Sequence, residues 1–267
     1  MTTTAVPVAA SDKSAVGSVG AILRDIARGG LAGLVVGIIV GGIGGRIVMR
    51  LAAIAVPASD GRFTENGNQI GDITLAGTLG LIVFGGVFVG AVGGTLWVVV
   101  APWIPGTGLR RAVLAVPVAV ALTGIGLING SNPDFRILQR DVGVVAMLLA
   151  LVALAGLSIA LVDGWLEGRL PPPGTSSRAD ATYAVLTLFG GVLILPFVVQ
   201  GFVADRTPLG LLLVAVGIAT LARWWMRHRG RERMPAALVV AARMGLVLGV
   251  VLGFVELAPH VARAIGA

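Results

Sequence analysis

The chain has no cysteine and only two histidines, His228 and His260, among its 267 residues. Without cysteine there is no disulfide and no thiolate chemistry, and two histidines are too few for the usual zinc sites. Charge is also scarce, because 12% of the residues are Asp, Glu, Lys or Arg, against about 25% in an ordinary soluble domain. We therefore expect no metal, no cofactor and a fold that keeps little of its surface in water.

Recognisable catalytic motifs are missing as well. The sequence contains no GxxxxGK[ST] phosphate loop, no HExxH and no GxSxG elbow. The glycine-rich stretch 41–45 lies inside an apolar segment with no preceding strand, which argues against a nucleotide site. We expect that the protein is not an enzyme. The alternative is a membrane-embedded enzyme acting on a lipid-linked or extracytoplasmic substrate, with Glu65, Asp72 and Asp134 as its acids.

Apolar residues dominate the chain. They make up 56% of it, and the mean hydropathy is +0.96. A soluble fold needs a polar exterior, so only a bilayer accommodates so much apolar surface. The net charge of +7 would suggest nucleic acid in a soluble protein, but here the basic residues lie between apolar segments, where they set membrane orientation. We expect no nucleic-acid partner, and the lipid bilayer as the main one.

Hydropathy predicts an all-α fold, a polytopic transmembrane bundle of about seven helices, with six and eight as the alternatives. A spanning helix needs about 20 mainly apolar residues. The segments that qualify are 30–52, 75–100, 112–128, 142–162, 183–203, 209–225 and 236–257. Residues 1–14 are expected to be a disordered tail, 15–28 an amphipathic helix on the membrane surface, 29–258 a single transmembrane bundle and 259–267 a short outer tail.

Two patterns favour a cytoplasmic N-terminus. In that topology 12 of the 20 basic residues lie in cytoplasmic segments and five in outer segments, as the positive-inside rule requires. All the tryptophans fall where the second, fourth and sixth predicted spans leave the membrane, on one face: Trp97, Trp103, Trp165, Trp224 and Trp225. Lys13 is the only lysine, which is typical of GC-rich bacteria, so the bacterial cytoplasmic (inner) membrane is expected. The basic run Arg223–Arg233 should contact anionic lipids of its inner leaflet.

Glycines four residues apart form ladders on three predicted helices. A ladder leaves one helix face without side chains, so a second helix can approach closely. The glycines and the alanine concerned are Gly29, Gly33, Gly37, Gly41, Gly45, Gly86, Gly90, Gly94, Ala241, Gly245, Gly249 and Gly253. We interpret the ladders as packing within one chain, with the first, second and seventh helices as the tight centre. Contact with a second copy or another membrane protein is an alternative, and a glycine-lined pore or sliding helix is another.

Polar residues gather at the predicted outer level of the membrane, where ionisable groups are costly and mark candidate sites. The proposed ligand-binding set is Arg46, Arg50, Asn132, Asp134, Gln200 and Glu256. If one arginine pairs with a carboxylate, the other guanidinium can bind a carboxylate or phosphate. The alternative is that each arginine extends separately to lipid phosphates. The set predicts a transporter-like protein or a membrane scaffold. A structural subunit that binds a partner through its glycine ladders is the remaining hypothesis.

Three short stretches carry a resemblance. They are Gly45-Arg46-Ile47-Val48-Met49-Arg50, Phe63-Thr64-Glu65-Asn66-Gly67-Asn68 and Asn132-Pro133-Asp134-Phe135. Together they resemble a group of actinobacterial multipass membrane proteins that has no assigned activity. The resemblance covers scattered motifs in the first half of the chain and implies a multipass fold, without implying an activity or a functional residue.

Overall fold

The computed structural model describes the chain except residues 1–8, 65–66, 68, 72, 205–207 and 230–233, and except the side chains of 9–18, 193–204, 208, 209 and 211. The described part is helical, with one isolated antiparallel bridge between Phe63 and Gln69. Its elements are α1 (Ala9–Val36), η1 (Gly37–Gly44), α2 (Gly45–Ala55), η2 (Pro57–Ser59), α3 (Leu75–Leu81), η3 (Ile82–Phe88), α4 (Val89–Val100), η4 (Ala101–Trp103), α5 (Gly108–Leu127), α6 (Asp134–Ile137), α7 (Val142–Glu167), α8 (Ser177–Ala204), α9 (Pro208–His228) and α10 (Ala236–Ile265).

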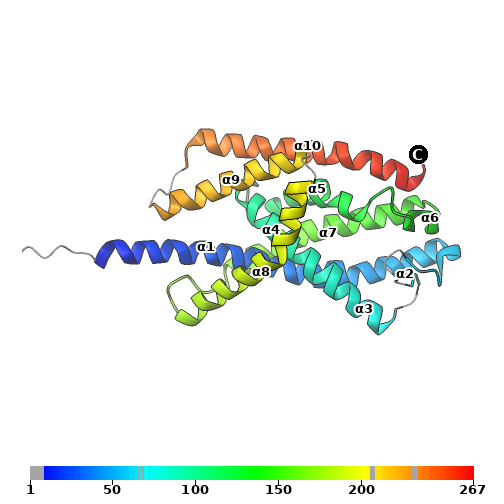
Figure 1. The fold of residues 1–267 in the computed structure, drawn as a ribbon, viewed down its shortest axis with the longest axis horizontal. Coiled ribbons are helices and arrows are strands. Elements are labelled where there is room, and N and C mark those ends of the chain that lie inside the picture. Colours follow the sequence, from blue (N-terminus) through cyan, green and yellow to red (C-terminus); the bar gives the residue numbers. More distant parts are fainter. Residues whose placement is uncertain (1–8, 65–66, 68, 72, 205–207, 230–233) are drawn as a thin grey trace, which may run out of the picture.

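The helices form an elongated bundle whose long axis is horizontal in Figure 1. The start of α1 lies at one end, here called the N-terminal end, and the chain finishes at the opposite, C-terminal end. Among the described residues, five segments are long and apolar enough to cross a membrane: Val19–Ala55, Leu75–Trp103, Gly108–Leu127, Val142–Glu167 and Ala236–Ile265. The chain is therefore a helical protein with several membrane-spanning candidates, as the hydropathy predicts.

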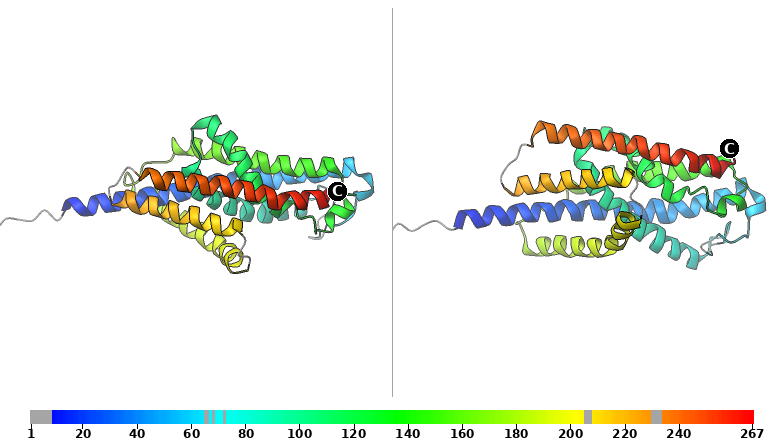
Figure 2. Two further views of the ribbon diagram at one scale, coloured as in Figure 1. Left: turned by 90° about the horizontal axis from the view of Figure 1, so that it is seen from above. Right: turned by 45° about the horizontal axis from the view of Figure 1, so that its top comes forward.

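The predicted spans 183–203 and 209–225 fall in α8 and α9, which the structure arranges differently from the other helices. α8 packs mainly on α1 and α9 mainly on α10, and both lie along the N-terminal half of the bundle, with α8 ending and α9 beginning near the middle of the long axis (Figures 1 and 2). Hydropathy depends only on the composition and length of a segment, so it does not predict where a helix lies relative to its neighbours.

Both ends of the chain are more helical than expected. Residues 9–14 and 15–28, expected as a disordered tail and a separate surface helix, belong to the same continuous helix as the first span. The two arginines of this segment bind protein groups: Arg24 and Arg28 donate hydrogen bonds to α7 and to the segment after it. Most of 259–267, expected as a tail, continues α10, with Ala264 buried.

The first two glycine ladders pack directly on each other. A Cβ on Gly33 would overlap the carbonyl oxygen of Gly90, and one on Gly37 would overlap that of Gly86. In the other direction, a Cβ on Gly94 would lie 2.7 Å from the carbonyl oxygen of Gly29. Two backbones meet here with no side chain between them, which allows weak Cα–H···O contacts and close dispersion contacts. The prediction of intramolecular packing is confirmed for these two ladders.

Both helices adopt π-helical geometry at this crossing. η1 and η3 are π-helices and pack against each other. In an α-helix four residues turn slightly more than one full turn, because a turn takes 3.6 residues. A π-helix has i→i+5 hydrogen bonds and more residues per turn, so four residues of a π-helix turn slightly less than one full turn. Alternating the two geometries therefore keeps glycines from Gly29 to Gly45 on one face of a long helix.

The third ladder does not join this centre, which corrects the expectation. α10 packs mainly against α5 and α9. A Cβ on Gly253 would overlap the carbonyl oxygen of Ala121 in α5, and one on Gly245 would lie 3.6 Å from the side chain of Val216 in α9. A glycine ladder predicts that another helix approaches closely. It does not predict which helix this is, because the glycine faces of all three ladders have the same shape.

Two of the tryptophans are core residues. Trp97 and Trp103 are buried in the main hydrophobic cluster near the N-terminal end, and the Trp103 indole N–H donates to Oγ1 of Thr220 at 2.9 Å. Trp165 and Trp225 are more than half exposed, and Arg169 and Arg229 stack over their rings. Only these two have the exposure expected of tryptophans in the membrane interface.

Candidate functional site

A buried guanidinium without a counter-charge lies towards the C-terminal end of the bundle. Arg46 is in the first turn of α2 and is 5% exposed. Its Nη1 contacts Sδ of Met49 at 4.0 Å, and its Nε has no hydrogen-bond partner. No carboxylate of the described residues forms an ion pair with it. An ionised group in such a place is costly unless an opposite charge accompanies it.

The first turn of α3 leaves room for this side chain. A Cβ on Gly77 would overlap Nη2 of Arg46, so the guanidinium rests on a glycine. One turn further along α2, Arg50 is exposed, and its Nη1 donates to the carbonyl oxygen of Gly71 at 2.6 Å. The two arginines, one turn apart on α2, therefore contact neighbouring parts of the chain: Arg46 the first turn of α3, and Arg50 the segment that leads into α3.

The other predicted ligand residues lie elsewhere. Glu256 is half-buried on α10, which packs on α5, whereas α2 packs on α7, and Figure 1 shows α5 and α7 between them. The Asn132 side-chain oxygen accepts from the backbone N–H of Asp134 at 2.7 Å, in a local turn just before the short helix α6. Gln200 lies on α8, outside the residues whose side chains are described. The structure does not bring Glu256 to the arginines.

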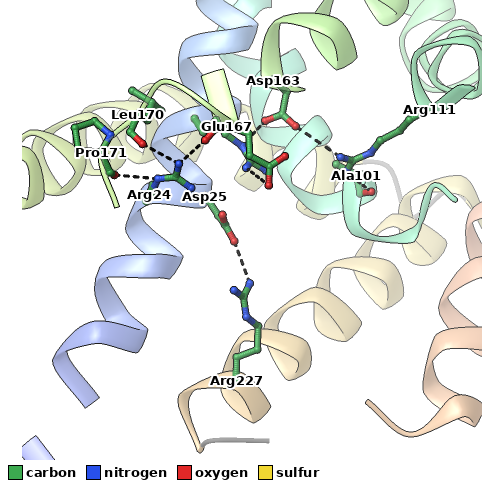
Figure 3. Close-up of polar contacts among 10 residues, drawn as sticks. Arg24, Asp25, Ala101, Arg111, Asp163, Glu167, Leu170, Pro171 and Arg227 are labelled. Carbon is green, nitrogen blue, oxygen red and sulfur yellow. Dashed lines mark hydrogen bonds and ion pairs between the residues drawn. The ribbon is translucent and has the colours of Figure 1, made fainter. Parts of the chain in front are cut away.

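A second polar centre, which sequence reasoning missed, lies towards the N-terminal end (Figure 3). Asp163, near the end of α7, has a side chain that is only 2% exposed. It accepts from Nε of Arg28 in α1 at 2.7 Å, and Nη1 of the same arginine lies 3.2 Å from the exposed carboxylate of Glu167. Arg111 of α5 reaches the other Asp163 oxygen at 3.9 Å. These four residues, here called the α1–α5–α7 ion cluster, join three helices.

Further contacts hold the arginines of this end in place. Nη2 of Arg111 donates to the carbonyl oxygen of Ala101 at 2.6 Å, and its guanidinium lies 5.1 Å from the centre of the Trp97 ring. Arg24 donates three hydrogen bonds to backbone carbonyls, one of Glu167 at the end of α7 and two of Leu170 and Pro171 in the segment that follows. Arg111 Nε, Trp97 Nε1 and one Asp163 oxygen are buried without a hydrogen-bond partner, so this cluster is tightly packed but incompletely satisfied.

The sequence does carry a signal for the ion cluster. Asp163 and Glu167 are four residues apart, as are Arg24 and Arg28, so each pair occupies one helix face. Hydropathy had already placed both pairs at the same side of the membrane. Positive charge near a membrane span also sets orientation, so the pattern does not by itself identify Arg28 and Arg111 as partners of Asp163.

Searches for relatives add no constraint. The chain matches no family model, and no curated protein or solved structure matches it either. Among the described residues, no group of His, Asp and Glu could hold a metal ion. The chemistry available at the described polar centres is that of guanidinium and carboxylate groups.

Proposed function

We propose that this chain is a non-enzymatic multipass protein of the bacterial cytoplasmic membrane that binds an oxyanion, a carboxylate or a phosphate, between Arg46 and Arg50. In the proposed orientation the N-terminus is cytoplasmic and the arginine pair faces the extracytoplasmic side. The single observation that supports this function is the buried Arg46 guanidinium, which no described carboxylate neutralises. A planar guanidinium presents donors in a fork that matches a carboxylate or phosphate.

The architecture around the pair fits a transporter-like use of that anion. Arg46 is the second residue after η1, and Gly77 lies in the first turn of α3, which leads into η3, so the proposed anion site lies at the end of the glycine crossing. The opposite end is closed by the α1–α5–α7 ion cluster. A transporter would open the Arg46 end while the ion cluster keeps the opposite end closed, as alternating access requires.

The partner-binding alternative through the glycine ladders has less support. The ladders on α1 and α4 cover each other, and the described glycines of α10 contact α5 and α9. A second copy or another membrane protein would therefore have to use a different face of the bundle.

Binding of small anions to the protein in a non-ionic detergent tests the proposal. Thermal unfolding is followed at constant ionic strength with sodium phosphate, succinate or a short-chain phosphatidylglycerol, so that a free phosphate, a carboxylate and a lipid headgroup are compared. A ligand at 100 times its Kd stabilises the folded protein by about 2.7 kcal/mol.

We expect saturable stabilisation by at least one of these ligands, lost in Arg46→Gln and retained in Arg136→Gln. The control removes the same charge from an exposed arginine of α6. No saturable effect in any arm, or an Arg46→Gln variant that responds like the wild type, would contradict the site. Once a ligand is known, uptake into proteoliposomes distinguishes transport from static binding.

A further inference from the structure

An apolar cavity of about 320 Å³ lies between α1, α4, α8 and α9. α1 contributes Ile26, Gly30 and Leu34 to its wall, so the cavity follows this helix for about 12 Å at 1.5 Å per residue. Phe189 of α8 and Trp224 of α9 also line it. A long slot with such walls suits a hydrocarbon chain and offers a polar molecule almost no hydrogen-bond partner.

The glycines of this cavity differ from those of the ladders. At Gly30 of α1, and at Gly190 and Gly191 of α8, no atom lies within 4 Å of the position that a Cβ would take. At Gly33, by contrast, a Cβ would overlap the backbone of the neighbouring helix. The cavity glycines therefore keep a space open, whereas the ladder glycines bring two helices together.

Positive charge lies next to the cavity, at the end of α9 that carries Trp224. Arg227 of α9 forms a partly exposed ion pair with Asp25 of α1 at 3.2 Å (Figure 3). Arg223 lies one turn before Arg227 in the direction of the cavity and precedes Trp224. It is half-buried, and it has neither an ion pair nor a hydrogen bond among the described residues.

We propose that this cavity binds one anionic phospholipid, with an acyl chain between α1, α4, α8 and α9 and its phosphate at Arg223, the residue that precedes Trp224. An adjoining apolar groove of about 590 Å³, lined by Val19 and Ile22 of α1, receives the second chain, and Trp224 lines both spaces. Val19, Ile22 and Ile26 of the segment 15–28, which is predicted to be a surface helix, thus line the proposed lipid site. This site is independent of the proposed anion site at the other end of the bundle.

Retention of defined lipids tests the proposal. The purified full-length protein is delipidated and then incubated with equal amounts of phosphatidylglycerol and phosphatidylcholine of the same acyl chains, and bound lipid is counted by native mass spectrometry. Gly30→Leu and Gly190→Leu fill the cavity. Gly93→Leu on α4 is the matched control, because it too has no atom within 4 Å of its Cβ position but does not line the cavity.

We expect one retained phosphatidylglycerol in the wild type and in Gly93→Leu, and at least a tenfold loss of affinity in both cavity variants. Arg223→Gln should weaken phosphatidylglycerol binding about fivefold, the factor that corresponds to about 1 kcal/mol for one basic residue at an anionic surface. Arg223→Gln leaves the cavity unfilled, so it keeps the proposal testable should a leucine variant fail to fold. Equal retention of the two lipids, or equal binding by Gly30→Leu and Gly93→Leu, would overturn the proposal and indicate ordinary annular lipid.

Discussion

Replacing Asp163 with asparagine should destabilise the bundle strongly. The substitution keeps the shape of the side chain but removes the charge between Arg28 and Arg111, whose side chains are only 12% and 20% exposed. The remaining carboxylate, on Glu167, is 60% exposed, so water screens it. Leaving buried charges without their partner typically costs about 3–5 kcal/mol, and we expect a loss of this size for Asp163→Asn.

Glu167→Gln is the matched comparison, because it removes a carboxylate that pairs with the same Arg28. An exposed ion pair contributes at most about 1 kcal/mol, so the two variants should differ severalfold. The free energy of unfolding in mixed micelles, measured by titration with a denaturing detergent and followed by tryptophan fluorescence, gives both values. If the two variants lose equal stability, or if Asp163→Asn loses less than Glu167→Gln, the buried cluster does not lock the helices as we argue.

Three further substitutions probe other parts of the fold. Gly33→Leu places a side chain where the backbone of Gly90 lies and should cost at least about 1–3 kcal/mol, whereas Gly93→Leu should stay within about 0.5 kcal/mol of the wild type; equal yields and unfolding curves would refute the ladder packing. Thr220→Val leaves the buried Trp103 N–H without its acceptor and should lower the unfolding free energy by about 1–3 kcal/mol, while an unchanged value would mean that the hydrogen bond contributes nothing. Replacing the three least exposed residues of the ion cluster, with Arg28→Met, Asp163→Leu and Arg111→Met together, should restore most of the stability that Asp163→Asn loses, because no buried charge remains unpaired; a triple variant less stable than Asp163→Asn would count against this reasoning.

Composition and hydropathy predict the class of fold because burial in lipid requires long apolar helices and little else. Glycine spacing also predicts the closest contact, between η1 and η3 and their flanking helices, since only residues without side chains allow it. The periodicity of the sequence shows which residues share a helix face, but it does not show which helix packs against that face. It therefore predicts neither the neighbours of α10 nor the placement of α8 and α9 along one half of the bundle.

Of the proposed ligand set, the sequence alone groups Arg46 with Arg50, because residues four apart on one helix lie on the same face. It could not tell that Glu256 lies beyond α5 and α7, since depth in the membrane says nothing about lateral position. Asp163 was missed for a similar reason. Its burial depends on Arg28, which is distant in the sequence and was assigned to a surface helix.

The account as a whole depends on which side of the membrane each end of the bundle faces, and the absence of native cysteine makes this directly measurable. Ser131→Cys lies in an exposed position at the C-terminal end, and Ser176→Cys in an exposed position at the N-terminal end. In intact cells, with a thiol reagent that does not cross the cytoplasmic membrane, we expect labelling at 131 and none at 176 until the membrane is permeabilised. Labelling at 176 alone would reverse the orientation, and labelling at both positions would contradict a bundle whose two ends lie on opposite sides of the membrane.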